Sequence, residues 1–271
     1  PDLIGSPLAR RFDIPYVTVE ASYAGKRDRD EWAEAQAISS SAIRQAGLNI
    51  CFTDRDAEGV ARLVPTERLA ILPPFADFSG LEIARQPKSA TGTVQLLAIA
   101  MMLKGNKLAS FRLLAEAFRR MPLGNWQLTI VGDGPVRDEV EAMFDGLERV
   151  RFAGQMDAAG VAGCLASSDV LVWPGYREAF GLAYLEAQGA GLPVIAMRSG
   201  GVEAVVRDGE TGILVEEGDT AQFANAVMKL VENTAVRKRL GKQAQAFALE
   251  ERGLAPASAL LDELLQEVVS R

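Results

Sequence analysis

Residues 169–201 read DVLVWPGYREAFGLAYLEAQGAGLPVIAMRSGG, and this stretch decides the fold. The apolar runs at 169–174 and 192–197 have the length of buried strands, and apolar positions at helical spacing fill residues 182–191 between them. Two strands that are joined through a helix lie parallel in one sheet, because a tight turn connects only antiparallel neighbours. The sequence therefore predicts an α/β fold with parallel sheets.

The same alternation of short apolar runs and helical patterns extends to both sides of this stretch. Further strands are expected at 14–20, 48–54, 68–74, 94–102, 126–134 and 213–219, and further helices at 31–46, 55–64, 108–121, 222–233 and 236–251. The polar segment 79–92 is the predicted linker between two lobes. The predicted domains are therefore 1–87, 88–250 and a C-terminal helix, 251–271, that packs on the first lobe.

Charge and cysteine content narrow the function classes. The net charge of −7 argues against nucleic acid as the main partner, because a nucleic-acid-binding protein normally has a basic face. Cys51 and Cys164 lie far apart in apolar surroundings, which predicts reduced thiols. No apolar stretch has the length of a membrane span, and no signal peptide is visible. We expect a cytoplasmic protein, peripheral at most on the inner face of a membrane.

Histidine is absent, which excludes zinc sites with histidine ligands and Ser-His-Asp triads. The tripeptide DRD occurs at 28–30 and 54–56 and is similar to a metal-binding D-x-D motif. The second copy lies between a predicted strand and a predicted helix, which favours Asp54 or Asp56 as the N-cap of that helix. The first copy lies in a charged run that is typical of a solvated loop. We therefore expect no metal site.

The densest group of candidate residues surrounds the start of the helix predicted after strand 169–174. First-turn amides have no partner within a helix and carry partial positive charge, so Phe180, Gly181 and Leu182 suit a phosphate or a sugar hydroxyl. Glu178 precedes this helix start, and Glu186 lies about one turn inside the helix with its side chain directed back toward the N-terminus. Two carboxylates suit a polyhydroxy ligand, although a solvated loop acid and an ordinary helix-surface acid explain them equally well.

The run from Pro174 to Asp219 resembles the donor-site signature of family-4 glycosyltransferases, which are retaining enzymes of the GT-B fold. It contains two glutamates eight positions apart, a G-x-P-V strand, a Gly-Gly loop with Glu203 after it, and a D-G-x-T-G turn. The segments VGDGP and RFAGQ fall where that family has similar segments. The resemblance covers roughly residues 45–250 and is dense over 94–220. It implies two Rossmann-like lobes with parallel sheets.

The resemblance assigns roles to matching residues only. It implies that Glu178 contacts the donor sugar, that Glu186 binds the ribose hydroxyls and that Lys107 offsets the charge of the leaving diphosphate. From the residues alone, Lys107 in LKGNKLAS reads as a surface lysine. The other donor-binding candidates lie in the glycine-rich loops and at the helix start: Gly132, Phe180, Gly181, Leu182, Gly200 and Gly201. The implied reaction needs no metal and no cofactor beyond the nucleoside-diphosphate sugar.

Three positions depart from the family pattern. Met101 stands where the family has a second diphosphate cation, an arginine, and Lys104 is a candidate substitute for it. Glu20 stands where the family often has a histidine in the acceptor lobe, and it is either an acceptor-side residue or an ordinary strand-end acid. The turn before the linker, PPFAD, keeps only Asp77 of the family's Asn-Gly-Val-Asp.

The implied function is transfer of a sugar from a UDP or GDP sugar to a sugar or glycolipid acceptor in cell-envelope synthesis. Two alternatives remain: a non-catalytic nucleotide-sugar-binding subunit, and a sugar-nucleotide epimerase of the same fold. The chain opens PDLIGSPLARRF without a methionine, and we expect an N-terminally truncated, incomplete first lobe. Such a lobe exposes a sheet edge and favours self-association. We expect this chain to bind a sugar nucleotide and to transfer sugar poorly.

Overall fold

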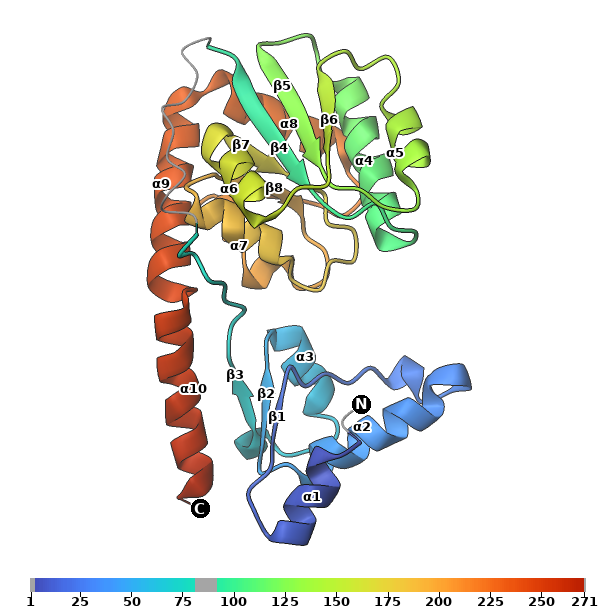
Figure 1. Cartoon of the computed structure of the whole chain (residues 1–271), viewed down its shortest axis with the longest axis vertical. Coiled ribbons are helices and arrows are strands. Elements are labelled where there is room, and N and C mark those ends of the chain that lie inside the picture. The colour runs from blue at the N-terminus through green and yellow to red at the C-terminus, as the bar shows by residue number, and fades with distance from the viewer. Residues whose placement is uncertain (1–2, 81–91, 271) are drawn as a thin grey trace. The chain divides into compact units, whose positions relative to one another are not determined.

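The computed structural model describes residues 3–80 and 92–270 (Figure 1). The chain divides into two compact units, of which unit 1 comprises Pro1–Pro74 with Leu254–Arg271 and unit 2 comprises Phe75–Gly253. The sequence-based boundaries were 87/88 and 250/251. Most of the predicted linker, 79–92, lies outside the described residues.

Unit 2 is built on one parallel sheet. In its described part the sheet has the strand order β6-β5-β4-β7-β8-β9, and every neighbouring pair is parallel. The strands are β4 (Val94–Ile99), β5 (Trp126–Val131), β6 (Val150–Gly154), β7 (Val170–Val172), β8 (Val194–Met197) and β9 (Gly212–Val215). The apolar runs that predicted this sheet form two of its inner strands, β7 and β8, which are buried along their whole length.

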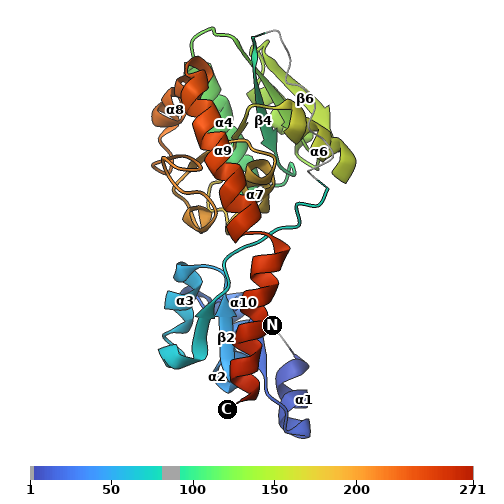
Figure 2. The ribbon, with the colours of Figure 1, turned by 90° about the vertical axis from the view of Figure 1, so that its left-hand side faces the viewer.

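Helices cover both faces of this sheet, as Figure 2 shows for α4 and α8 on one side and α6 on the other. The helices are α4 (Asn106–Arg120), α5 (Arg137–Met143), α6 (Ala158–Ser167), α7 (Leu182–Gly189), α8 (Thr220–Glu232) and α9 (Thr234–Glu251), and the 3-10 turn η5 spans Val202–Ala204. Helix α4 packs against α8, and α7 packs against α9. Phe111 and Phe118 of α4 are fully buried in the core that these layers share.

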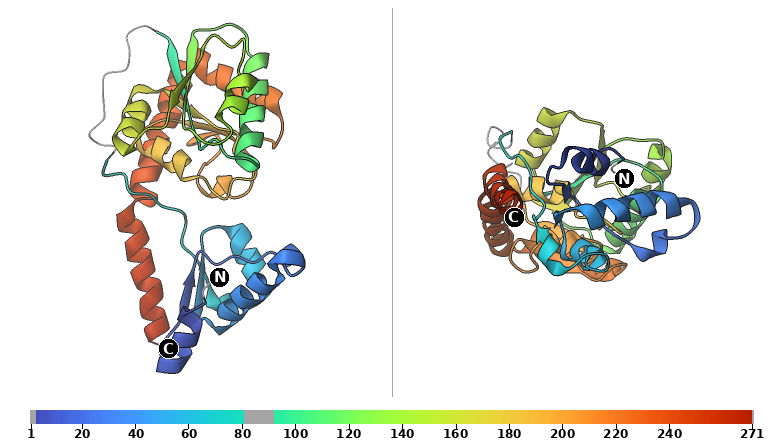
Figure 3. Two further views of the ribbon diagram at one scale, coloured as in Figure 1. Left: turned by 45° about the vertical axis from the view of Figure 1, so that its right-hand side comes forward. Right: turned by 90° about the horizontal axis from the view of Figure 1, so that it is seen from below.

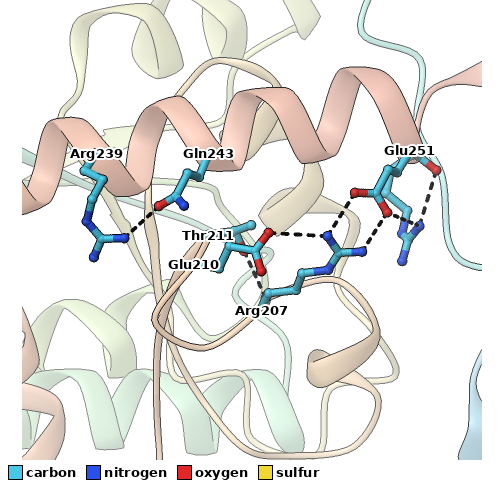
Figure 4. A network of polar contacts seen from close by, with 7 residues as sticks. Arg207, Glu210, Thr211, Arg239, Gln243 and Glu251 are labelled. Carbon is cyan, nitrogen blue, oxygen red and sulfur yellow. Dashed lines mark hydrogen bonds and ion pairs between the residues drawn. The ribbon is translucent and has the colours of Figure 1, made fainter.

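An arginine fastens α9 to the connection between β8 and β9 (Figure 4). The Arg207 guanidinium donates to both carboxylate oxygens of Glu251, at 2.9 and 2.6 Å, and lies 4.3 Å from the centre of the Phe247 ring. The amide of Arg207 donates to the Thr211 hydroxyl at 2.9 Å, which closes the turn. Thr211 of the D-G-x-T-G motif therefore closes the turn, and Arg207, which directly precedes the motif, holds this strand connection against the last helix of the unit.

Unit 1 holds a smaller parallel sheet in the order β1-β2-β3 (Figure 3). Its strands are β1 (Val17–Val19), β2 (Leu48–Cys51) and β3 (Leu69–Ile71). Its helices are α1 (Gly5–Phe12), α2 (Ala33–Gln45), α3 (Asp54–Val60) and α10 (Leu254–Val269), with short 3-10 turns η1 (Gly25–Arg27), η2 (Asp30–Trp32) and η3 (Thr66–Arg68).

The two cysteines, Cys51 and Cys164, are both free, as predicted. Burial raises the pKa of the Cys51 thiol to about 11.

One predicted detail of unit 1 is wrong: neither Asp54 nor Asp56 is the N-cap of α3. Thr53 holds that position with an extended backbone, and its hydroxyl accepts the Asp56 amide at 3.1 Å. The cap residue has to precede the first helical residue, and both aspartates already lie in the first turn. There the helix dipole favours their negative charge.

No helix in the described part of the chain is long and apolar enough to cross a membrane.

Candidate functional site

The strand order of unit 2 creates a topological switch point between β4 and β7. From β4 the chain runs outward to β5 and β6, and then it returns to the other side of β4 and runs outward through β7, β8 and β9. The loops that follow β4 and β7 therefore lead away from each other and leave a crevice at the carboxyl edge of the sheet, where ligands bind in open α/β sheets. Lys107 follows β4, in the first turn of α4, and Glu178 follows β7.

The structure brings these two residues into direct contact. The Lys107 ammonium lies 2.6 Å from Oε2 of Glu178, and the two side chains are only 29% and 16% exposed. The Trp173 indole donates to the same carboxylate oxygen at 3.5 Å, and the ammonium lies 5.8 Å from the centre of the Trp173 ring. Partial burial makes this pair stronger than an ion pair in open water. Two residues 71 positions apart in sequence thus form one charged centre.

Two buried serines hold the loop that carries Glu178. The Ser110 hydroxyl of α4 accepts the Tyr176 amide at 2.9 Å, and the Ser199 hydroxyl after β8 accepts the Arg177 amide at 2.7 Å. Sequence reasoning missed both serines, since a serine within an apolar helix and a serine in a glycine-rich loop carry no signal of such a role. A buried hydroxyl needs a hydrogen-bond partner, and here each finds it in the backbone of the site loop.

The start of α7 adds unsatisfied donors to this edge. Gly181 is the N-cap, and within the described residues the amides of Gly181 and Leu182 donate to no protein group. Leu182 is exposed, whereas Phe180 packs partly against the core. Helix α7 begins shortly after Glu178 in the chain and has its positive end at that point. This arrangement can bind an anion such as a diphosphate.

Glu186 lies in α7 as a half-buried carboxylate. Across the parts of the chain that the structure describes, its carboxylate has neither an ion pair nor a hydrogen bond. Burial raises the pKa of Glu186, and no neighbouring cation offsets this effect. Hydroxyl groups that donate hydrogen bonds to such a half-buried carboxylate stabilise its ionised form. The geometry therefore leaves Glu186 able to bind a ribose or another diol.

The raised pKa of Glu186 yields a test that needs no ligand. The folded protein holds the Glu186 proton more tightly than the unfolded chain does, so ionisation lowers folding stability as pH rises above about 4.3. Glutamine at this position does not ionise, so the variant does not lose folding stability in this way. We expect Glu186→Gln to have a higher Tm than the wild type at pH 7 and the same Tm below about pH 4. Thermal unfolding at both pH values checks this, with Glu148→Gln, at an exposed glutamate, as the control. An unchanged Tm at pH 7 would contradict it.

Close packing against neighbouring backbone explains why glycine occupies several positions of the site. A Cβ at Gly132 would lie 1.9 Å from the Ala100 carbonyl oxygen, and a Cβ at Gly200 would lie 1.7 Å from that of Glu178. Both residues also have a positive φ. Gly201 is buried, and its amide donates to the Glu178 carbonyl at 3.1 Å. These glycines therefore hold neighbouring strand-end loops together, and their predicted contact with a donor stays a prediction.

Three further candidates take no part in this cluster. Glu20 lies in unit 1 after β1, exposed and with φ 59°, and it stays a prediction as an acceptor-side residue. Met101 is 61% exposed in the loop after β4, and Lys104 is exposed in the same loop. No cluster of metal-ligating side chains occurs among residues 3–80 and 92–270.

Two other cations near this edge, Arg198 and Arg137, are already engaged by acids. Arg198, after β8, pairs with Glu203 at 2.5 Å and Asp208 at 2.6 Å. Arg137, at the start of α5, pairs with Asp133 at 3.0 Å and Glu141 at 2.7 Å. Arg198 also lies 3.7 Å from Glu216, so each of these arginines is neutralised by at least two carboxylates. Lys107 faces the single carboxylate of Glu178, which makes it more available to a ligand than these two arginines.

Comparison with known proteins points to one family. The family model described as Glycosyl transferases group 1 matches residues 94–233, more than half of the chain. The lipopolysaccharide core biosynthesis glycosyltransferase LpsE of Rhizobium meliloti is 29% identical over 234 residues, which are 85% of this chain and 66% of LpsE. The phosphatidyl-myo-inositol mannosyltransferase of Mycobacterium leprae is 42% identical over 115 residues, which are 42% of this chain and 30% of that protein.

Among solved structures, Anabaena Alr3699/HepE in complex with UDP and glucose superposes with a TM-score of 0.76 at 19% identity. The match covers 97% of this chain and 74% of that chain. The present chain thus spans less than a third of the mannosyltransferase and about three quarters of the structural neighbour.

Proposed function

The chain belongs to the glycosyl transferases group 1 family. On that premise we propose that it transfers the sugar of a nucleoside-diphosphate sugar to an acceptor hydroxyl. The observation that carries the proposal is the Lys107–Glu178 pair at the switch point, with the free amides of α7 following Glu178 in the chain. A cation and a helix N-terminus together suit a diphosphate that gains negative charge as it leaves.

Each residue has a distinct role in this proposal. The Lys107 ammonium and the amides of Gly181 and Leu182 bind the diphosphate and stabilise it as the bond to the sugar breaks. Glu178 accepts hydrogen bonds from the sugar hydroxyls, and Glu186 accepts them from the ribose. The two glutamates bind and orient the donor. This differs from glycoside hydrolases, in which a carboxylate pair works as acid and base or nucleophile.

The finer features of the activity are also proposals. We infer retention of the anomeric configuration, a UDP or GDP sugar as donor, and no requirement for a metal. The structural neighbour in complex with UDP and glucose supports a nucleotide-sugar donor. The names of the LpsE and mannosyltransferase relatives support a sugar or glycolipid acceptor in envelope synthesis.

One observation favours a second candidate, a subunit that binds the sugar nucleotide without transferring it. Met101 presents an exposed apolar side chain where the resemblance expects an arginine, so the site has one diphosphate cation fewer. Weaker stabilisation of the leaving group would reduce turnover more than binding.

Release of the nucleoside diphosphate separates the two candidates. The chain is incubated with UDP- or GDP-sugar and a glycolipid acceptor, the released diphosphate is measured, and the anomeric configuration of the product is read by NMR. An enzyme releases diphosphate only with acceptor present and gives a product that retains the donor's configuration. Donor binding without acceptor-dependent release would favour the binding subunit, and an inverted product would overturn the proposed retention.

A further inference from the structure

The Lys107–Glu178 ion pair joins two groups that the proposed function assigns to different parts of the donor. Lys107 is assigned to the diphosphate and Glu178 to the sugar, yet in the structure each is the partner of the other at 2.6 Å. We infer that Glu178 competes with the diphosphate for Lys107, and that the sugar of an intact donor frees Lys107 by engaging Glu178. This inference rests on the proposed function and deepens it.

The geometry makes the competition direct. At 2.6 Å the carboxylate accepts one of the three ammonium N–H groups and offsets its charge, so a phosphate that approaches Lys107 meets a neutralised cation and a nearby negative charge. Both side chains are largely shielded from water, which strengthens their attraction. Trp173 contacts both partners, through its indole N–H to the carboxylate and its ring face toward the ammonium. A diphosphate therefore gains less from Lys107 while Glu178 is paired with it than it would gain from an unpaired lysine.

The backbone of Glu178 is fixed, so only its side chain can change partner. Its amide donates to the Gly175 carbonyl at 3.0 Å, and its carbonyl accepts the Gly201 amide at 3.1 Å. Ser110 and Ser199 hold the two residues before it. The new partner must lie within reach of a glutamate side chain at the start of α7. The hydroxyls of a sugar on the diphosphate meet that condition, because the diphosphate itself occupies the same helix start.

The consequence is discrimination between donor and product. A bare nucleoside diphosphate that binds Lys107 leaves the Glu178 carboxylate unpaired and partly buried. The carboxylate then lies close to the negatively charged phosphates, which is unfavourable. An intact donor supplies hydroxyl groups that satisfy the carboxylate. After transfer the sugar is gone, Glu178 again competes for Lys107, and the product diphosphate is released more readily.

A calorimetric double-mutant cycle tests this inference. UDP and UDP-glucose are titrated into the full chain, Glu178→Gln, Lys107→Gln and the double variant, with GDP and GDP-mannose used if the UDP ligands do not bind. We expect Glu178→Gln to bind the bare diphosphate about tenfold more tightly, because Lys107 has lost its competitor, and to bind the sugar nucleotide no more tightly. In the Lys107→Gln background the same change should have an effect of less than about twofold.

Glu148→Gln is the matched control, since it removes the same charge from an exposed glutamate of unit 2 that is not part of the Lys107–Glu178 pair. It should change diphosphate affinity less than about twofold. Diphosphate affinity that is unchanged or weaker in Glu178→Gln, or an equal gain in Glu148→Gln, would overturn the inference and leave the proposed function intact. Absence of binding by all four ligands to the wild type would overturn the proposed function and the inference with it.

Discussion

Replacing Lys107 by alanine is expected to weaken UDP binding by about 10- to 100-fold while leaving uridine affinity unchanged. Lys107 is the cation at the switch point that faces a single carboxylate, and its partner in the proposed complex is the diphosphate. Its removal also leaves the Glu178 carboxylate without a counter-charge, next to the phosphates. Calorimetric titration with UDP and uridine measures both affinities.

Lys229→Ala serves as the control for this experiment, because it removes an equal charge from α8, away from the Lys107–Glu178 pair. It should leave both affinities unchanged. Equal losses for UDP and uridine in Lys107→Ala would mean that the lysine supports the fold of the loop and does not bind the diphosphate.

Replacing Gly200 by alanine is expected to lower the free energy of unfolding by about 3 kcal/mol and to abolish donor binding. The new Cβ would lie 1.7 Å from the Glu178 carbonyl oxygen, so the loop that carries Glu178 has to move. The left-handed backbone at Gly200, with φ 62°, adds a smaller cost of about 1 kcal/mol.

Gly209→Ala is a matched control for this substitution, because Gly209 has a similar φ of 73° and no atom within 4 Å of an added Cβ. It should cost only about 1 kcal/mol and should keep donor binding. Urea unfolding and calorimetry measure the two effects. Equal destabilisation by the two substitutions would show that the contact with Glu178 does not matter.

The sequence predicted most of the elements of unit 2, because its strands are apolar runs between regular helical patterns. The predicted strand at 94–102 and helix at 108–121 correspond to β4 (Val94–Ile99) and α4 (Asn106–Arg120). The α/β GT-B fold class implied by the resemblance is confirmed by the match to solved glycosyltransferase structures. The predicted ends of the strands were less accurate, because apolar residues continue past the last residue that pairs with a neighbouring strand and into the loops.

The contacts of the site could not be predicted from local pattern. The pairing of β4 with β7 depends on strand order, which periodicity does not contain, and this pairing is what places Lys107, at the start of α4, beside the loop that carries Glu178. For the same reason nothing in LKGNKLAS distinguished Lys107 from a surface lysine until its partner was known. The supporting hydroxyls of Ser110 and Ser199 depend on the same three-dimensional arrangement.

The central claim is that the carboxyl edge of the unit 2 sheet binds a nucleoside-diphosphate sugar through Lys107, Glu178 and Glu186. Calorimetric titration of the wild type and Glu186→Gln with UDP-, GDP- and ADP-sugars tests it most directly, because this substitution is expected to keep the protein folded. We expect one of these donors to bind the wild type with one site per chain and to bind Glu186→Gln about tenfold more weakly. Binding of none of the three donors, or equal affinity of the two proteins, would contradict it.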